Sequence, residues 1–163
     1  MKNPLNIVVK ARIEREGCID TSLTGDSMKP ILCNNDRVIV VPAKQLSIGN
    51  FYLFELPDGS MGVHRLIAYK SNRAVLKGDK CERYEQISLD RIIGEAIKIM
   101  PVGCSTWIEM KQGYIIRMIS CCLSKGSTRQ ISSALIKEKP PTFIRVKRFL
   151  LSITSTYCRK FWK

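Results

Sequence analysis

Between residues 21 and 100, short apolar runs alternate with turn-forming residues, and this alternation constrains the fold more than any other feature. Runs rich in β-branched residues, bounded by proline, glycine, asparagine and aspartate, are typical of strands joined by tight turns. Strands are therefore expected over residues 37–41, 51–56, 62–69, 74–77 and 90–99, with a loop over residues 78–86. The pattern predicts an all-β unit over residues 21–100.

The segments on either side of this unit have different patterns. Residues 1–20 are expected to form a helix or a strand that leads into the β unit. Beyond residue 104, apolar residues recur at steps of three and four from Trp107 onward, which predicts amphipathic helices before and after Pro140 and Pro141. The predicted fold is mainly β with a C-terminal α-helical extension, α+β overall, divided into a β domain (1–103) and a basic helical extension (104–163).

The basic residues are concentrated in the last third of the chain, whose 163 residues carry a formal net charge of +13. Residues 1–103 contain 15 Lys and Arg against 12 Asp and Glu, whereas residues 104–163 contain 12 against 2. So basic a segment favours an anionic partner. Two alternatives stay open: the C-terminal helices lie on an anionic membrane surface, or they pack on the β domain with a solvated basic face. No recognition motif supports nucleic-acid binding.

The seven cysteines and the single histidine argue against a metal site. The cysteine count is odd, no Cys-x-x-Cys spacing occurs, and one histidine offers few nitrogen ligands. We therefore expect reduced thiols, no metal and no cofactor. The sequence shows no secretory signal peptide and no apolar run long enough to span a bilayer. These features predict a cytoplasmic or peripheral membrane location.

Ser27 and His64 are the candidate catalytic pair. A serine is a weak nucleophile until a neighbouring base accepts its proton, and His64 is the only imidazole in the chain. Each residue also has a structural interpretation, since Ser27 precedes Pro30 in a turn-rich segment and a lone histidine in a strand often only packs there. If the two side chains meet in space, the protein is expected to be a hydrolase.

Three motifs follow one another in the chain: GDSMKP at residues 25–30 with NDRVIV at 35–40, VHRLI at 63–67, and LKGD at 76–79. In this order they resemble the type I signal peptidase family and its relatives among the self-cleaving repressor peptidases. The resemblance covers residues 21–100. Because it has histidine at position 64, the chain resembles the Ser/His branch of that group. Members outside this branch have a lysine at the same position. The resemblance implies a β-rich peptidase core.

The resemblance also implies roles for individual residues. Ser27 is the expected nucleophile, His64 the base, and Asp79 the acidic residue that supports the histidine. Because the residues after Asp79 depart from the family pattern, Glu82 and Glu85 remain alternatives for the acidic role. The amides of Gly25, Ser27 and Met28 are the expected oxyanion-stabilising and substrate-binding groups.

The predicted function is that of a serine endopeptidase, similar to signal peptidase I, that cleaves a precursor or leader peptide in trans. The substrate is expected to add as an extended strand beside Ser27. Two alternatives remain: a catalytically inactive peptidase fold that serves as a basic binding module, and a dedicated maturation peptidase for a ribosomally synthesised peptide.

Overall fold

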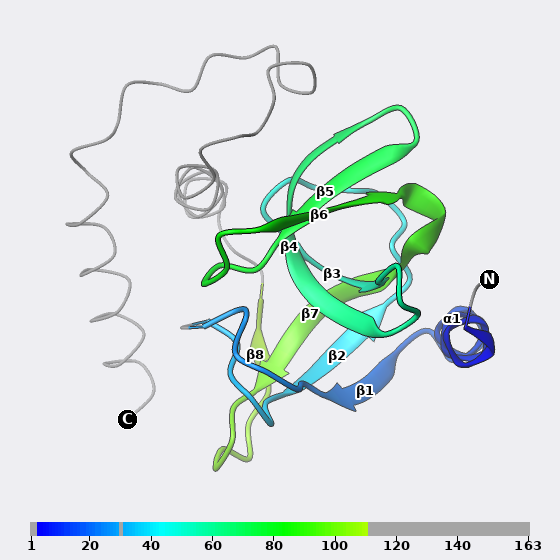
Figure 1. The fold of residues 1–163 in the computed structure, drawn as a ribbon. Helices are drawn as coiled ribbons and strands as arrows, with labels where there is room; N and C mark the ends of the chain where they lie inside the picture. The colour runs from blue at the N-terminus through cyan, green and yellow to red at the C-terminus, as the bar shows by residue number, and fades with distance from the viewer. Residues whose placement is uncertain (1–2, 30, 111–163) are drawn as a thin grey trace.

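The computed structural model describes residues 3–29 and 31–110. In this part of the chain one helix precedes a mainly antiparallel sheet of eight strands. The elements are α1 (Pro4–Glu16), β1 (Ile19–Ser22), β2 (Arg37–Val41), β3 (Phe51–Glu55), β4 (Met61–Lys70), β5 (Arg73–Lys77), β6 (Tyr84–Ser88), the short 3₁₀ helix η1 (Leu89–Arg91), β7 (Ile92–Met100) and β8 (Ile108–Glu109). The spatial strand order is β1-β2-β7-β3-β4-β5-β6, and β8 pairs with β7 (Figure 1).

The strands predicted from the apolar runs are present as β2, β3, β4, β5 and β7. Two apolar clusters hold the curved sheet together, one built around Phe51 and Leu53 and the other around Tyr52 and Leu66. Burial of each such side chain contributes about 1.5–3 kcal/mol to folding. Neighbouring residues of β3 therefore supply both clusters, which explains why its four apolar residues, 51–54, are all buried.

Helix α1 settles the choice between helix and strand for the first residues. The Asn3 side chain caps the helix by accepting from the Leu5 amide, Pro4 occupies the first turn, and Gly17 ends the helix with a φ of 80°. The Asn3 and Asn6 side-chain amides both donate to the Gly59 carbonyl, at 3.1 and 2.9 Å. These hydrogen bonds fasten the start of α1 to the turn between β3 and β4.

Two sequence-based expectations about strands are wrong. Residues 84–86, expected in a loop, belong to β6, which pairs with β5 along its whole length. Residues 108–109, expected at the start of a helix, form β8, which pairs Ile108 with Ile99. Helical spacing of apolar residues from Trp107 did not reveal this pairing, because a two-residue strand depends on its partner rather than on a pattern of its own. The helices predicted farther along, from residue 111 on, lie outside the described residues.

Three segments converge to build the candidate site: the β1–β2 connection, which carries Ser27; strand β4, which carries His64; and the β5–β6 hairpin. Cross-strand pairs relate the last two, because Leu66 lies opposite Leu76, and Leu76 lies opposite Glu85. Within residues 3–29 and 31–110, no helix has the length and apolarity required to cross a membrane.

Candidate active site

Ser27 lies in the connection between β1 and β2, which is closed at its base by backbone hydrogen bonds. The Leu23 amide donates to the Asp36 carbonyl at 2.8 Å, and the Asn35 amide donates to the Leu23 carbonyl at 2.9 Å. The buried Asp36 carboxylate accepts from two amides, Cys33 at 2.7 Å and Val102 at 3.0 Å. Asp36 thus ties the serine-bearing connection to the segment after β7.

Met28, next to the serine, faces the interior. It is 4% exposed and packs with Leu32 into the first apolar cluster. Because Met28 is anchored in this way, the preceding residue is held at the edge of the core.

The structure brings Ser27 and His64 together. The Ser27 Oγ lies 3.1 Å from His64 Nε2, within hydrogen-bonding distance. His64 is 8% exposed, and its ring lies 5.4 Å from the Phe54 ring on the adjacent strand β3. The Phe54 contact and burial restrict the imidazole to few orientations, so the base is already aimed at the hydroxyl.

Glu85, on β6, provides the carboxylate beside the histidine. Its Oε2 lies 2.8 Å from His64 Nδ1. A carboxylate accepts hydrogen bonds, so this contact favours a proton on Nδ1 and leaves Nε2 free to accept from the Ser27 hydroxyl. Serine, imidazole and carboxylate form one continuous hydrogen-bonded series.

Asp79, the residue first expected to support the histidine, does not contact it. Its carboxylate oxygens accept from Arg65 Nε at 2.8 Å and from Arg65 Nη2 at 2.7 Å. The physical reason lies in the alternation of side chains along β4: His64 and Arg65 are consecutive and point to opposite faces. A residue bonded to Arg65 therefore lies on the other side of the strand from the imidazole. Glu82, the third acidic candidate, is exposed and does not contact His64.

The three amides expected to stabilise an oxyanion are not equivalent. The Gly25 N–H donates to the Asn34 side-chain oxygen at 3.0 Å, so it is used within its own connection. Gly25 adopts a φ of 93°, a conformation that favours glycine. Among the described residues, the N–H groups of Ser27 and Met28 have no hydrogen-bond acceptor. The Gly25 amide thus differs from the other two, because it already has an acceptor within its own connection.

Two oppositely charged side chains lie next to the serine in its connection. Asp26 forms an ion pair with Lys29 at 2.9 Å, and the hydrogen bond from the Lys29 ammonium lowers the pKa of the Asp26 carboxyl. Among the described residues, no group of three or more histidine, cysteine, aspartate or glutamate side chains is placed to hold a metal ion. The reactive groups that the structure brings together here are a serine, an imidazole and a carboxylate.

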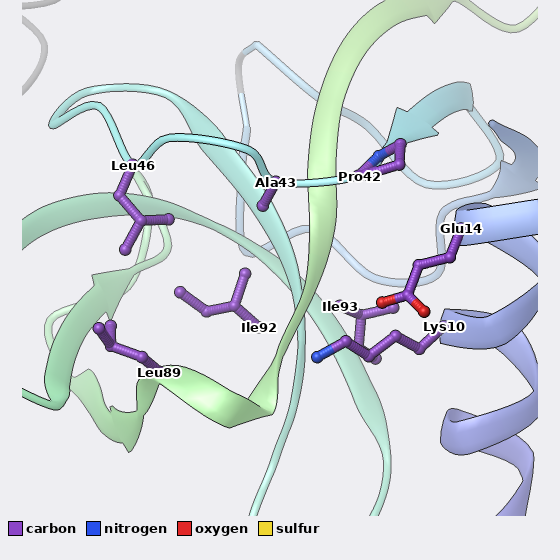
Figure 2. Close-up of a pocket in the computed structure, with 8 residues that line it drawn as sticks. All are labelled: Lys10, Glu14, Pro42, Ala43, Leu46, Leu89, Ile92 and Ile93. Atoms are coloured by element: carbon purple, nitrogen blue, oxygen red, sulfur yellow. The ribbon is translucent and has the colours of Figure 1, made fainter. Parts of the chain in front are cut away.

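A separate cavity of about 330 Å³ lies between α1, the connection after β2, and η1 with the start of β7 (Figure 2). Its walls are mainly aliphatic, and Lys10 and Glu14 extend from α1 at one side. None of Ser27, His64 and Glu85 lines it. The cavity is therefore distinct from the candidate active site.

A serine, an imidazole and a carboxylate in one hydrogen-bonded series are the arrangement of serine peptidases, recognised by geometry rather than by sequence order. The comparison with protein families agrees with this class. Residues 6–102, more than half of the chain, match the peptidase S24-like family, and the chain belongs to that family. A search of curated proteins finds no match. The family match confirms the resemblance to repressor-type peptidases at this level.

Sequence reasoning placed Asp79 first in the acidic role and kept Glu85 only as an alternative. The sequence of β6, Tyr-Glu-Gln-Ile-Ser, does not alternate clearly between apolar and polar residues, so it gave no local signal of a strand. Recognising that strand, and its pairing with β5, would have placed Glu85 on the same face as Leu76 and Leu66. His64 lies two residues before Leu66 and shares that face.

Proposed function

We propose that this chain is a serine endopeptidase in which Ser27 is the nucleophile, His64 the general base and Glu85 the carboxylate that supports the histidine. The observation that carries the proposal is the hydrogen-bonded series itself, with 3.1 Å between Ser27 Oγ and His64 Nε2 and 2.8 Å between His64 Nδ1 and Glu85. Membership of the peptidase S24-like family supports the same assignment. An inactive binding module would not require the hydroxyl and the imidazole to lie within reach of each other.

The proposed reaction begins when Ser27 Oγ attacks the scissile carbonyl carbon and His64 Nε2 accepts the hydroxyl proton. Glu85 stabilises the imidazolium that forms. The N–H groups of Ser27 and Met28 are the proposed donors to the oxyanion, each contributing about 3–4 kcal/mol. The carbon–nitrogen bond then breaks and the leaving amine takes the proton from Nε2. Water, deprotonated by His64, then attacks the resulting ester; the bond between the acyl carbon and Ser27 Oγ breaks, and His64 returns the proton to that oxygen.

The substrate proposed for this site is an extended peptide. Residues 61–64 of β4 pair with β3 on one side, whereas the pairing of β4 with β5 begins only at Arg65. Among the described residues, the other edge of β4 just before His64 therefore has no partner strand. An extended peptide that adds to this edge would gain backbone hydrogen bonds and pass directly beside the base.

The physiological substrate is proposed to be a precursor or leader peptide cleaved in trans, as the resemblance to signal peptidases suggests. A dedicated maturation peptidase for a ribosomally synthesised peptide is one form of this proposal. Comparing the peptides of cells that express the wild-type protein with those of cells that express Ser27→Ala would identify the precursor and its cleavage site. Peptides that accumulate uncut only with the variant are the expected result.

A serine-directed phosphonate probe tests the chemistry. We expect the purified wild-type protein to be labelled at Ser27, labelling to be lost in Ser27→Ala, and the rate to fall steeply in His64→Ala. Ser105→Ala, a substitution of an exposed serine that the site does not use, is the matched control and should be labelled like the wild type. Labelling that persists in both Ser27→Ala and His64→Ala would exclude the proposed pair.

A further inference from the structure

The turn that follows β5 lies directly on the backbone of Ser27. The Lys80 N–H donates to the Ser27 carbonyl at 2.9 Å. Gly78 approaches so closely that an added Cβ would lie 2.7 Å from the Ser27 carbonyl oxygen and 3.1 Å from Ser27 Cβ. Since real Cβ atoms do not approach backbone atoms at 2.7 Å, only glycine fits at position 78 without moving one of the two segments. The turn therefore contacts the backbone of Ser27, while the Ser27 hydroxyl contacts His64.

Asp79, between Gly78 and Lys80, anchors this turn to the sheet. It accepts two hydrogen bonds from Arg65, whose side chain is fully buried, while the Asp79 side chain is 13% exposed. Arg65 in turn donates to the Gly49 carbonyl at 2.6 Å and lies 4.3 Å over the Phe51 ring. A paired, two-point contact between guanidinium and carboxylate restricts orientation as well as distance. The turn is thus held by a fully buried partner that has contacts of its own in the sheet.

The partner of Asp79 is also the chain neighbour of the proposed base. His64 and Arg65 follow one another in β4 and point to opposite faces, so one strand holds the imidazole on one side and the anchor of the turn on the other. His64 contacts the Ser27 hydroxyl, and the turn held by Arg65 contacts the Ser27 backbone. The distance between nucleophile and base is then fixed by two contacts that start from adjacent residues.

We propose that Asp79 is a positioning residue: bound to Arg65, it holds residues 78–80 against Ser27 so that the Ser27 hydroxyl stays within reach of His64. The catalytic consequence of this role rests on the proposed peptidase function, whereas the contact of the turn with Ser27 does not. The role differs from direct support of the histidine, which the geometry assigns to Glu85.

Asp79→Asn tests the role, because an amide offers one acceptor oxygen and turns its NH₂ toward the guanidinium donors. Asp20→Asn is the matched control, since Asp20 also binds an arginine, Arg37, at two points, but at an exposed position at the edge of the sheet. Three quantities are measured: the exchange rate of the Lys80 amide hydrogen, the ring Nδ1 proton signal of His64, and the phosphonate labelling kinetics.

In Asp79→Asn we expect the Lys80 amide to exchange at least about tenfold faster, because its acceptor moves away, while amides of β7 stay protected. The rate constant for inactivation should fall by about 10- to 100-fold with little change in the probe's binding constant, since misplacement of a reacting group by about 1 Å has that effect. The His64 Nδ1 proton signal should persist, because Glu85 is untouched. Asp20→Asn should change none of the three.

Two results would overturn the proposal: a Lys80 amide that exchanges at the wild-type rate in Asp79→Asn, or a His64 ring proton signal that disappears in that variant. If the wild-type protein is not labelled at all, the peptidase function fails, but the amide exchange still decides the structural role of Asp79. Should Asp79→Asn not fold, Gly78→Ala replaces it, since the added Cβ displaces Ser27 while the Arg65 contact remains. The same faster Lys80 exchange and slower inactivation are then required.

Discussion

The substitution Glu85→Gln tests the acidic member of the site most directly. It keeps the size and the hydrogen-bonding oxygen of the side chain and removes the negative charge beside His64 Nδ1. The contact is 2.8 Å long, and the side chains of His64 and Glu85 are 10% and 25% exposed. A charge-assisted hydrogen bond in such a partly buried place contributes about 1.5–3 kcal/mol to stabilising an imidazolium. The expected loss is therefore about 10- to 160-fold in the rate constant for inactivation.

The assay is the time course of labelling by the phosphonate probe, with the inactivation and binding constants separated by varying the probe concentration. Glu82→Gln is the matched control, because Glu82 lies three residues earlier, is exposed and does not contact His64. We expect Glu85→Gln to slow inactivation and to shift or remove the His64 Nδ1 proton signal, with the Lys80 amide still protected. The control variant should label at the wild-type rate.

A rate in Glu85→Gln within a factor of two of the wild type would refute the assignment of Glu85. So would a variant whose thermal unfolding shows that the lost rate comes from a lost fold. The comparison with Asp79→Asn then separates the two acidic residues, since each variant is expected to change one local signal and leave the other in place.

Two further predictions concern the fold and a thiol. Ile13→Ala should lower the free energy of unfolding, measured by urea titration, by about 2–5 kcal/mol, because Ile13 is fully buried. Ile7→Ala should change it little, because Ile7 is 56% exposed. Equal losses in the two variants would contradict the packing of α1 on the sheet. Burial raises the pKa of the Cys33 thiol, so fewer Cys33 thiolates form at a given alkaline pH, and iodoacetamide should modify Cys33 more slowly than the exposed Cys18, as mass spectrometry of timed digests would measure.

Most of the sheet could be predicted because its strands contain their own signal. The run 37–41 is apolar and β-branched, and it ends at Pro42. Edge strands carry a weaker signal: β1 alternates half-buried and exposed residues, and β6 buries only Ile87. Each of these two strands is identified by its hydrogen bonds to one neighbour, β2 for the first and β5 for the second. Such pairing is a property of distant segments and is not visible in a local window.

The candidate site likewise contains residues that could be predicted from the sequence and residues that could not. Ser27 and His64 could be selected because each lies in one of the ordered motifs, and because His64 is the only histidine in the chain. The acidic partner could not, since Asp79 and Glu85 both follow the histidine, and the choice depends on the pairing of β6 with β5. The hydrogen bond of the Gly25 amide could not be predicted either, because its acceptor, the Asn34 side chain, lies nine residues farther along the chain.

One carboxylate could not perform both tasks that the structure separates. The imidazole and Arg65 leave β4 on opposite faces, so an acidic residue that reaches Nδ1 cannot also hold the turn beneath Ser27. Glu85 shares the face of His64 through the cross-strand pairs Leu66 with Leu76 and Leu76 with Glu85. Asp79 lies two residues after Lys77, and Lys77 lies opposite Arg65. The register of β4, β5 and β6 therefore assigns the proton-related role to one acidic residue and the positioning role to the other, and a shift of one residue in β6 would exchange the faces and remove Glu85 from the histidine.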